Sequence, residues 1–172
     1  MSGKLYVVFI LLVLFRLLAL YISKENEKKL LASGAVEYGK TTSKYLAILH
    51  TMIYFSSFFE GIITHVKSDM LSFVGIIMMM ISYSVLLFVI KTLNRYWTVK
   101  LIFEENHKIN STWIFKKIKH PNYFFNIIPE LIGITFIFHA WVTFAIGCIP
   151  YGVCLYLRIR QENSLLTRYN GS

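Results

Sequence analysis

The chain has 172 residues, of which 56% are hydrophobic and only 16% charged, yet its formal net charge is +9. A soluble domain carries about 25% charged residues, so the composition excludes one, and 14 Phe with 11 Tyr exclude a disordered chain. The length suits a single domain that covers residues 1–172. An excess of basic over acidic residues is typical of proteins that bind nucleic acid, an acidic ligand or a membrane surface. The positions of the basic residues decide among these three partners.

Three apolar runs come first along the chain, at Leu5–Ile22, Tyr45–Val66 and Leu71–Ile90. Each is close to the roughly 20 residues that a helix needs to cross a bilayer, so we expect three membrane-spanning helices. The first run is long for a signal peptide, contains Arg16 and has no small-residue cleavage motif close behind it. These features favour an uncleaved anchor helix over a cleaved signal peptide.

The last apolar region, Tyr123–Leu157, is too long for one helix and short for two full spans with a turn. We expect a tight hairpin of two short helices that turns near His139. Pro129 and Pro150 lie inside these helices and are expected to kink them. The predicted fold class is therefore an all-α integral membrane protein with about five transmembrane helices, the last two forming the hairpin.

The basic residues alternate between the connections in a way that indicates an orientation. The first connection holds five, the third holds seven and the C-terminal tail holds three, whereas the N-terminal end and the second connection hold one each. The positive-inside rule then predicts the N-terminus outside and the C-terminus in the cytoplasm. This orientation explains most of the charge without nucleic acid, and it leaves open a second use of the same charges on anionic lipid or ligand.

The two long connections, roughly Ser23–Lys44 and Lys91–Asn122, are too short to bury cores of their own. The first is predicted to continue the preceding helix to near Gly34, and the third to begin as a helical extension over KTLNRYWTVKLI. Neither contains a Gly-rich phosphate loop, so short loops and the cytoplasmic ends of the helices must hold any cofactor. Cys148 and Cys154 lack metal-ligand spacing and are predicted to be reduced packing residues, with no metal site.

Ionisable side chains inside apolar runs are costly in a bilayer and are therefore candidates for function. They are Arg16, His50, Glu60 and Glu130. One interpretation is structural, with these residues paired to one another, for example Arg16 with Glu60. The other is functional, and the sequence favours neither. His65 and His139 lie near the outer helix ends and are expected to be interfacial.

The densest polar cluster belongs to the two cytoplasmic ends of the hairpin. Its members are His120, Pro121, Tyr123 and Asn126 at one end, and Arg158, Glu162 and Asn163 at the other. Because a hairpin brings both of its ends to one face, the two groups should meet. Arg158 and Glu162 are four residues apart and share a helix face, which indicates either an ordinary salt bridge or a site that combines a ring, a carboxylate and a guanidinium.

The segments KHPNYFFNIIPELIG and YLRIRQENSLL resemble the isoprenylcysteine carboxyl methyltransferase family, which is related to phospholipid N-methyltransferases. The matching residues are Lys119, His120, Pro121 and Tyr123 in the first segment, and Arg158, Ile159, Glu162, Asn163 and Leu166 in the second. NEKKLLASGAVEYGK and LNRYWTVKL resemble bacterial members. The chain departs from the family at Asn163, where a second glutamate is usual, at Lys119, where arginine is commoner, and at Trp113-Ile114-Phe115, where Gly-Pro-Tyr is usual.

The resemblance implies an integral membrane methyltransferase that uses S-adenosyl-L-methionine, in a bacterial inner membrane with its active site facing the cytoplasm. The cofactor-binding residues it implies are His120, Pro121, Tyr123, Asn126 and Glu162, with Glu162 on the ammonium group. Arg158 would orient an acceptor carboxylate or enolate. Glu130 would serve as a base for a phenol or enol acceptor.

The expected partners are membrane lipids and a lipophilic acceptor that enters from the bilayer. The family's eukaryotic substrate is an isoprenylated cysteine, but the bacterial character of the early segment favours a long-chain lipid or a polyketide-like carboxylate or enol. Two alternatives stay open. One is a phospholipid-type amine N-methyltransferase, and the other is a non-catalytic membrane scaffold.

Overall fold

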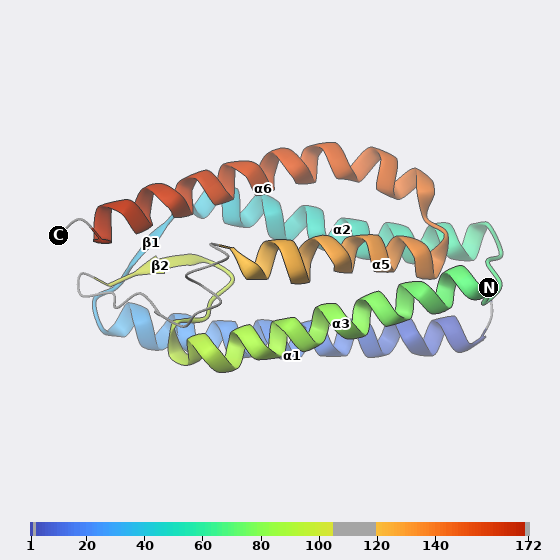
Figure 1. Ribbon diagram of the computed structural model, residues 1–172, viewed down its shortest axis with the longest axis horizontal. Helices are drawn as coiled ribbons and strands as arrows, with labels where there is room; N and C mark the ends of the chain where they lie inside the picture. Colours follow the sequence, from blue (N-terminus) through green and yellow to red (C-terminus); the bar gives the residue numbers. More distant parts are fainter. Residues whose placement is uncertain (2, 105–119, 171–172) are drawn as a thin grey trace.

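The protein is a bundle of long helices that lie side by side along one axis, with a short β-pair at one end (Figure 1). The structure, a computed structural model, describes residues 1, 3–104 and 120–170. The helices are α1 (Gly3–Ala32), α2 (Lys40–Ile63), α3 (Met70–Leu93), α5 (Ile128–Phe138) and α6 (Trp141–Asn170). The remaining elements are strands β1 (Val36–Tyr38) and β2 (Leu101–Phe103), a 3-10 turn (Asn94–Tyr96) and a π-helix (Asn122–Ile127).

The lengths and surfaces of the helices are those of a membrane protein. In the part of the chain that is described, four helices are long and apolar enough to cross a bilayer, and Asn122–Phe138 is a shorter apolar helix. Large apolar side chains such as Leu14, Phe59 and Ile146 are exposed on the outside of the bundle, where only lipid can solvate them well. The all-α membrane class that the composition predicted is therefore confirmed.

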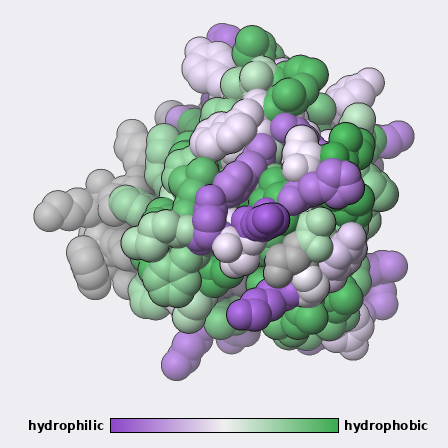
Figure 2. All heavy atoms as spheres, turned by 90° about the vertical axis from the view of Figure 1, so that its right-hand side faces the viewer, coloured by the Kyte–Doolittle hydropathy of each residue, from purple (hydrophilic) through white to green (hydrophobic). Residues whose placement is uncertain are grey.

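The chain ends lie at opposite ends of the bundle, as an odd number of passes along it requires (Figure 1). Figure 2 looks at the end away from the β-pair, where hydrophilic side chains gather near the middle with hydrophobic ones around them. The turn between α5 and α6 is at this end, at His139, whose φ is 51°. The hairpin forms, but the expectation of two short helices is wrong for α6, which has 30 residues.

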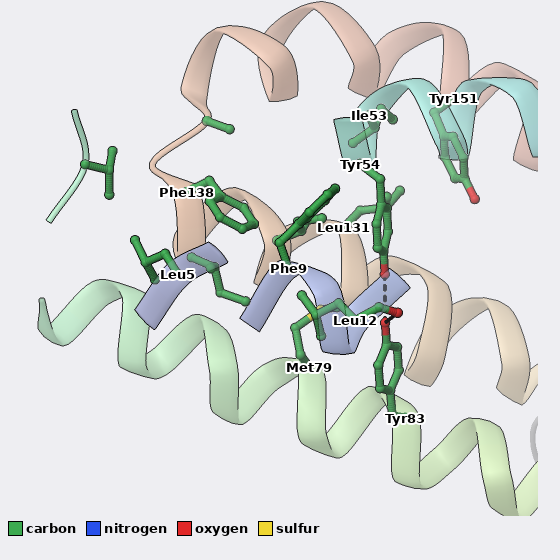
Figure 3. Close-up of a cluster of buried hydrophobic side chains, with 14 of the residues drawn as sticks. Leu5, Phe9, Leu12, Ile53, Tyr54, Met79, Tyr83, Leu131, Phe138 and Tyr151 are labelled. Carbon is green, nitrogen blue, oxygen red and sulfur yellow. Dashed lines mark hydrogen bonds between the residues drawn. The ribbon is translucent and has the colours of Figure 1, made fainter. Parts of the chain in front are cut away.

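The core lies between α1, α2, α3 and α5 and is rich in aromatic rings (Figure 3). Phe9 of α1 stacks on Phe58 of α2 with ring centroids 4.0 Å apart, and meets Phe138 edge-on at 5.9 Å. Helices in lipid associate through such packing and through small residues that let backbones approach. Gly75 of α3 is such a residue, because a Cβ there would lie 2.6 Å from the carbonyl oxygen of Gly133 in α5.

The predicted helical extension after the third span is wrong beyond Leu93. Asn94 has a φ of 48°, in the left-handed region that an α-helix cannot continue through, and α3 ends there. After the 3-10 turn the chain becomes β2, which pairs antiparallel with β1 so that Ile102 faces Glu37. By contrast, α1 does continue to Ala32, and Gly34 follows it with a φ of 90°, as predicted.

A π-helix lies just before Pro129, where the sequence predicts a kink. Proline has no N–H group, so the α-helical hydrogen bond from residue 129 to the carbonyl of Phe125 cannot form. One residue earlier, the N–H of Ile128 donates to the carbonyl of Tyr123, five residues back. This wider turn carries Tyr123 and Asn126, so the proline shapes the start of the candidate site. Pro150 does lie inside α6.

We predict that Gly75→Ala destabilises the bundle, because the new methyl group would meet both the carbonyl of Gly133 and the backbone nitrogen of Ile137. The expected loss in free energy of unfolding is about 1–3 kcal/mol, as for overpacked cores. Gly152→Ala is the matched control, since nothing lies within 4 Å of its Cβ position. Thermal unfolding of both variants in detergent measures the difference, and equal stabilities would contradict the close α3–α5 contact.

Candidate active site

The π-helix and α6 bring four of the predicted site residues into contact at the end of the bundle that holds the β-pair. The hydroxyl of Tyr123 donates to Oε2 of Glu162 at 2.5 Å and accepts from Nε of Arg158 at 3.1 Å. Nδ1 of His120 lies 3.3 Å from Oε1 of Glu162. The rings of His120 and Tyr123 are stacked with centroids 5.5 Å apart, so the cluster is continuous from His120 to Arg158.

Asn163, which stands where the family usually has a second glutamate, belongs to the same cluster. Its Oδ1 is 3.0 Å from Nε2 of His120. A ring with its proton on Nδ1 donates that proton to the Glu162 carboxylate. A side-chain amide can either accept from or donate to the other ring nitrogen, so Asn163 accommodates both the neutral and the charged ring.

Arg158 is almost completely buried, with 3% of its surface exposed. Its guanidinium donates to Oγ of Ser43 at the start of α2, to the carbonyl of Val99 at 2.7 Å, and to the hydroxyl of Tyr123. All three acceptors are neutral oxygens, and no carboxylate among the described residues forms an ion pair with Arg158. A guanidinium has five N–H donors, so two N–H groups of Arg158 remain without an acceptor after these three bonds. Burying a cation without an anion beside it is costly. Arg158 therefore has no direct ion-pair partner among the described residues, and the Glu162 carboxylate is joined to it through the Tyr123 hydroxyl.

Pro121 and Asn126, the two other predicted cofactor residues, are placed differently. Pro121 directly precedes the π-helix, with a φ of −62°, and is buried beside His120. Asn126 is fully buried, but its Oδ1 accepts from Ser82 of α3 at 2.8 Å and its Nδ2 donates to Asn122 at 2.9 Å. The structure therefore does not bring Asn126 into the cluster, and its amide secures the π-helix against α3.

Glu130, the predicted base, lies deeper in the bundle and is fully buried. Its carboxylate accepts from Nε of Arg16 at 2.5 Å and from the hydroxyl of Tyr54. The Tyr54 hydroxyl in turn lies 3.1 Å from that of Tyr83, toward which it points in Figure 3. The expected structural pairing of Arg16 with Glu60 is therefore wrong, because the partner of Arg16 is Glu130, 114 residues away in the chain.

Glu60 instead holds the start of α6. Its two carboxylate oxygens accept from the backbone N–H groups of Val142 and Thr143 at 3.0 and 2.8 Å. An anion at this position satisfies free donors and complements the helix dipole. At the same end of the bundle, Asp69 accepts from the backbone of Ser72 at 2.9 Å and lies 3.1 Å from Nε2 of His139. The hydrogen bond from Ser72 lowers the pKa of Asp69.

A cavity of about 220 Å³ connects the cluster with the bilayer side of α1 and α2. Tyr123, Arg158 and Ser43 line one part of it, and Arg16 and His50 line the other. His50 reaches Tyr151 of α6, with Nδ1 3.2 Å from the tyrosine hydroxyl. Glu130 does not line the cavity, because Arg16 and Tyr54 cover its carboxylate.

The mouth of this cavity is apolar and faces lipid. Leu17 and Leu20 of α1 and Phe55 of α2 line it and are each about half exposed. The cavity that holds the Arg158 guanidinium therefore has an apolar, exposed edge between α1 and α2.

Sequence reasoning missed four contributors to the site, namely Ser43, Tyr54, Tyr151 and the carbonyl of Val99. None of them has a local signal, because a serine near a helix start and tyrosines in apolar runs are common in any membrane helix. The packing of α2 against α6 brings the three side chains to the cavity, and the segment before β2 brings the Val99 carbonyl. Lys119 and Trp113-Ile114-Phe115, where the chain departs from the family pattern, lie outside the described residues.

Comparison with known proteins agrees with the geometry. The model of the isoprenylcysteine carboxyl methyltransferase (ICMT) family matches residues 75–168, which include both halves of the cluster. A protein of Haemophilus influenzae is 37% identical over 161 residues that cover 94% of each chain. The Bacillus subtilis protein YpbQ is 26% identical over 161 residues, covering 93% of this chain and 95% of that one, and both relatives are described as uncharacterised. No solved structure matches.

The chain therefore belongs to the isoprenylcysteine carboxyl methyltransferase family. The members of this family are membrane methyltransferases, in agreement with the four long apolar helices.

We predict strong energetic coupling between Arg16 and Glu130. Removing one partner, as in Arg16→Met or Glu130→Gln, leaves a buried unpaired group and should cost about 3–5 kcal/mol of unfolding free energy. The double variant R16M/E130Q should lose much less than the sum of the two single losses. Lys28 and Glu25, an exposed pair 2.8 Å apart on α1, are the control and should show no measurable coupling. Additive losses at Arg16 and Glu130 would contradict the buried pair.

Proposed function

We propose that the protein is an S-adenosyl-L-methionine-dependent O-methyltransferase that acts on a carboxylate or enol of a lipophilic substrate from the bilayer. One observation carries the proposal. The buried Arg158 guanidinium has two free N–H donors, lacks an anionic partner among the described residues, and lines a cavity that opens to lipid. A carboxylate or enolate supplies the missing negative charge and the acceptors in one group.

The residues of the cluster fit the cofactor by their chemistry. The Glu162 side chain is 23% exposed, and each of its oxygens has one hydrogen bond, to Tyr123 or to His120. Since a carboxylate accepts about four hydrogen bonds, it has room for an ammonium group. The stacked rings of His120 and Tyr123 suit an adenosine, and Pro121 shapes their loop. When bound, S-adenosyl-L-methionine supplies an activated methyl group on a sulfonium.

The protein's part in the reaction is positioning. Arg158 orients the acceptor oxygen, and the apolar cavity keeps water away from it, so that alignment and desolvation supply most of the rate. An ionised acceptor needs no base. For an enol or phenol, we propose His50 as the proton acceptor, because it lines the cavity whereas Glu130 is covered by Arg16. Glu130 then acts as a positioning residue, and Asn126 supports the π-helix.

The proposed location is a bacterial inner membrane with the site toward the cytoplasm. Both relatives above come from bacteria, and strands β1 and β2, which belong to the two basic connections, are at the end of the bundle that holds the cluster. The acceptor is proposed to be a long-chain lipid or polyketide-like acid or enol.

We predict that the purified protein in lipid nanodiscs binds S-adenosyl-L-methionine in a calorimetric titration. Glu162→Gln removes the charge that faces the ammonium group and His120→Ala removes the stacked ring, so each should weaken binding by at least about tenfold, the cost of one charge-assisted hydrogen bond. Glu25→Gln makes the same chemical change on the exposed face of α1 and should leave affinity unaltered. Absence of binding by the unmodified protein would overturn the proposal.

We predict that cell lipid extracts incubated with methyl-labelled cofactor gain label in a base-labile ester or enol ether. Arg158→Lys should lower methyl transfer by about 10²-fold, because lysine cannot reproduce the planar array of donors, while cofactor affinity changes little. Arg160→Lys, on the exposed side of α6, is the control. Label in an amine headgroup would favour the phospholipid N-methyltransferase instead, and unchanged transfer by Arg158→Lys would exclude the role of Arg158.

A further inference from the structure

A second hollow lies beside the cavity, between the end of α1, β1 and the start of α2, with a volume of about 720 Å³. Its wall is amphipathic. The charged residues that line it are Lys24, Lys28, Lys40, Lys44 and Lys100 together with Glu27 and Glu37. The proposed methyl transfer uses none of these lysines, and a solvated face would not gather them around one depression.

Two of the five lysines are neutralised by neighbouring glutamates. Nζ of Lys100 bonds to Glu27 and lies 3.4 Å from Glu37, and the bond to Glu27 raises the pKa of Lys100. Lys28 pairs with Glu25 at 2.8 Å. Both glutamates in the wall are therefore already occupied.

The other three lysines have no such partner. Lys24, Lys40 and Lys44 form no ion pair with any residue in 1, 3–104 and 120–170. Like charges around one hollow repel each other, and an anion in the hollow would relieve that repulsion. The charge pattern therefore indicates an anionic ligand.

The apolar part of the wall indicates that this anion carries a hydrocarbon chain. Leu20, Ala47 and Val99 line both the hollow and the lipid-facing cavity. Leu20 and Leu31 are exposed within this region. An apolar path therefore leads from the lysines to the bilayer, and a small soluble anion would make no use of it.

We propose that this hollow binds the phosphate headgroup of an anionic membrane lipid. Lys24, Lys40 and Lys44 hold the phosphate, and the acyl chain lies along Leu20 and Ala47 toward the bilayer. Anionic lipids are concentrated by basic groups at the cytoplasmic surface, the side on which the positive-inside rule puts these lysines. This hollow shares Ser43 and Val99, the partners of Arg158, with the neighbouring cavity. The three lysines have no role in the proposed methyl transfer, so the lipid proposal does not depend on it.

The test uses purified full-length protein in neutral detergent, titrated with phosphatidylglycerol or phosphatidylcholine of identical chains and analysed by native mass spectrometry. Phosphatidylglycerol should bind at least about tenfold more tightly, given three cations near one headgroup. The variant K24Q/K40Q/K44Q should lose this preference. The variant K29Q/K67Q/K91Q removes the same charge from exposed positions outside the hollow and should keep it. Equal losses in the two variants, or equal binding of the two lipids, would overturn the proposal.

A second substitution tests the hydrocarbon path with every lysine in place. Ala47→Trp fills the apolar wall and should weaken phosphatidylglycerol about tenfold, whereas Ile48→Trp, exposed on α2 and outside both cavities, should not. Inorganic phosphate is the probe for a soluble anion. If it binds as tightly as the lipid, or if Ala47→Trp has no effect, the lipid assignment is overturned.

Discussion

The ion pair between Arg16 and Glu130 is the interaction on which the rest of the bundle depends. An unpaired charge in a bilayer is too costly to keep, so α1 and α5 must be positioned for these two side chains to meet. The hydroxyl groups of Tyr54 and Tyr83 extend the network to α2 and α3, and Tyr83 donates to the carbonyl of Leu12. Four helices are thereby held in one arrangement at mid-depth, where apolar packing alone would specify them poorly.

This arrangement also creates the cavity. The side chain of Arg16 bonds to Glu130. The space beside it, between α1 and α2, is lined by His50 and by the apolar side chains of Leu17, Leu20 and Phe55. The polar network thus supports the cavity on one side, while the cluster around Arg158 closes it on the other. The cavity is thus lined by one arginine, Arg16, that pairs with a carboxylate, and by another, Arg158, that forms no ion pair with a described residue. That difference separates the structural arginine from the one available to a ligand.

The hairpin explains how the two halves of the site meet. A π-helix directly precedes Pro129 and carries Tyr123 to a position against Arg158, 35 residues later in the chain. The sequence predicted this meeting correctly, because the ends of a hairpin share a face whatever the details of its helices. It predicted the partner of Arg16 wrongly, since helix periodicity relates residues within one helix and says nothing about contacts between helices. It also missed β2, because the pairing with β1 that stabilises this strand is not local.

The amino-acid sequence by itself determined the membrane class and the clustering of His120, Tyr123, Arg158 and Glu162, because hydropathy and hairpin geometry are local properties of the chain. Only the tertiary structure decided that Glu130 balances Arg16, that Ser43 and the Val99 carbonyl hold Arg158, and that three lysines surround one amphipathic hollow. The physical reason is that charge pairing and burial depend on distances between side chains from different helices. Those distances exist only once the bundle has packed.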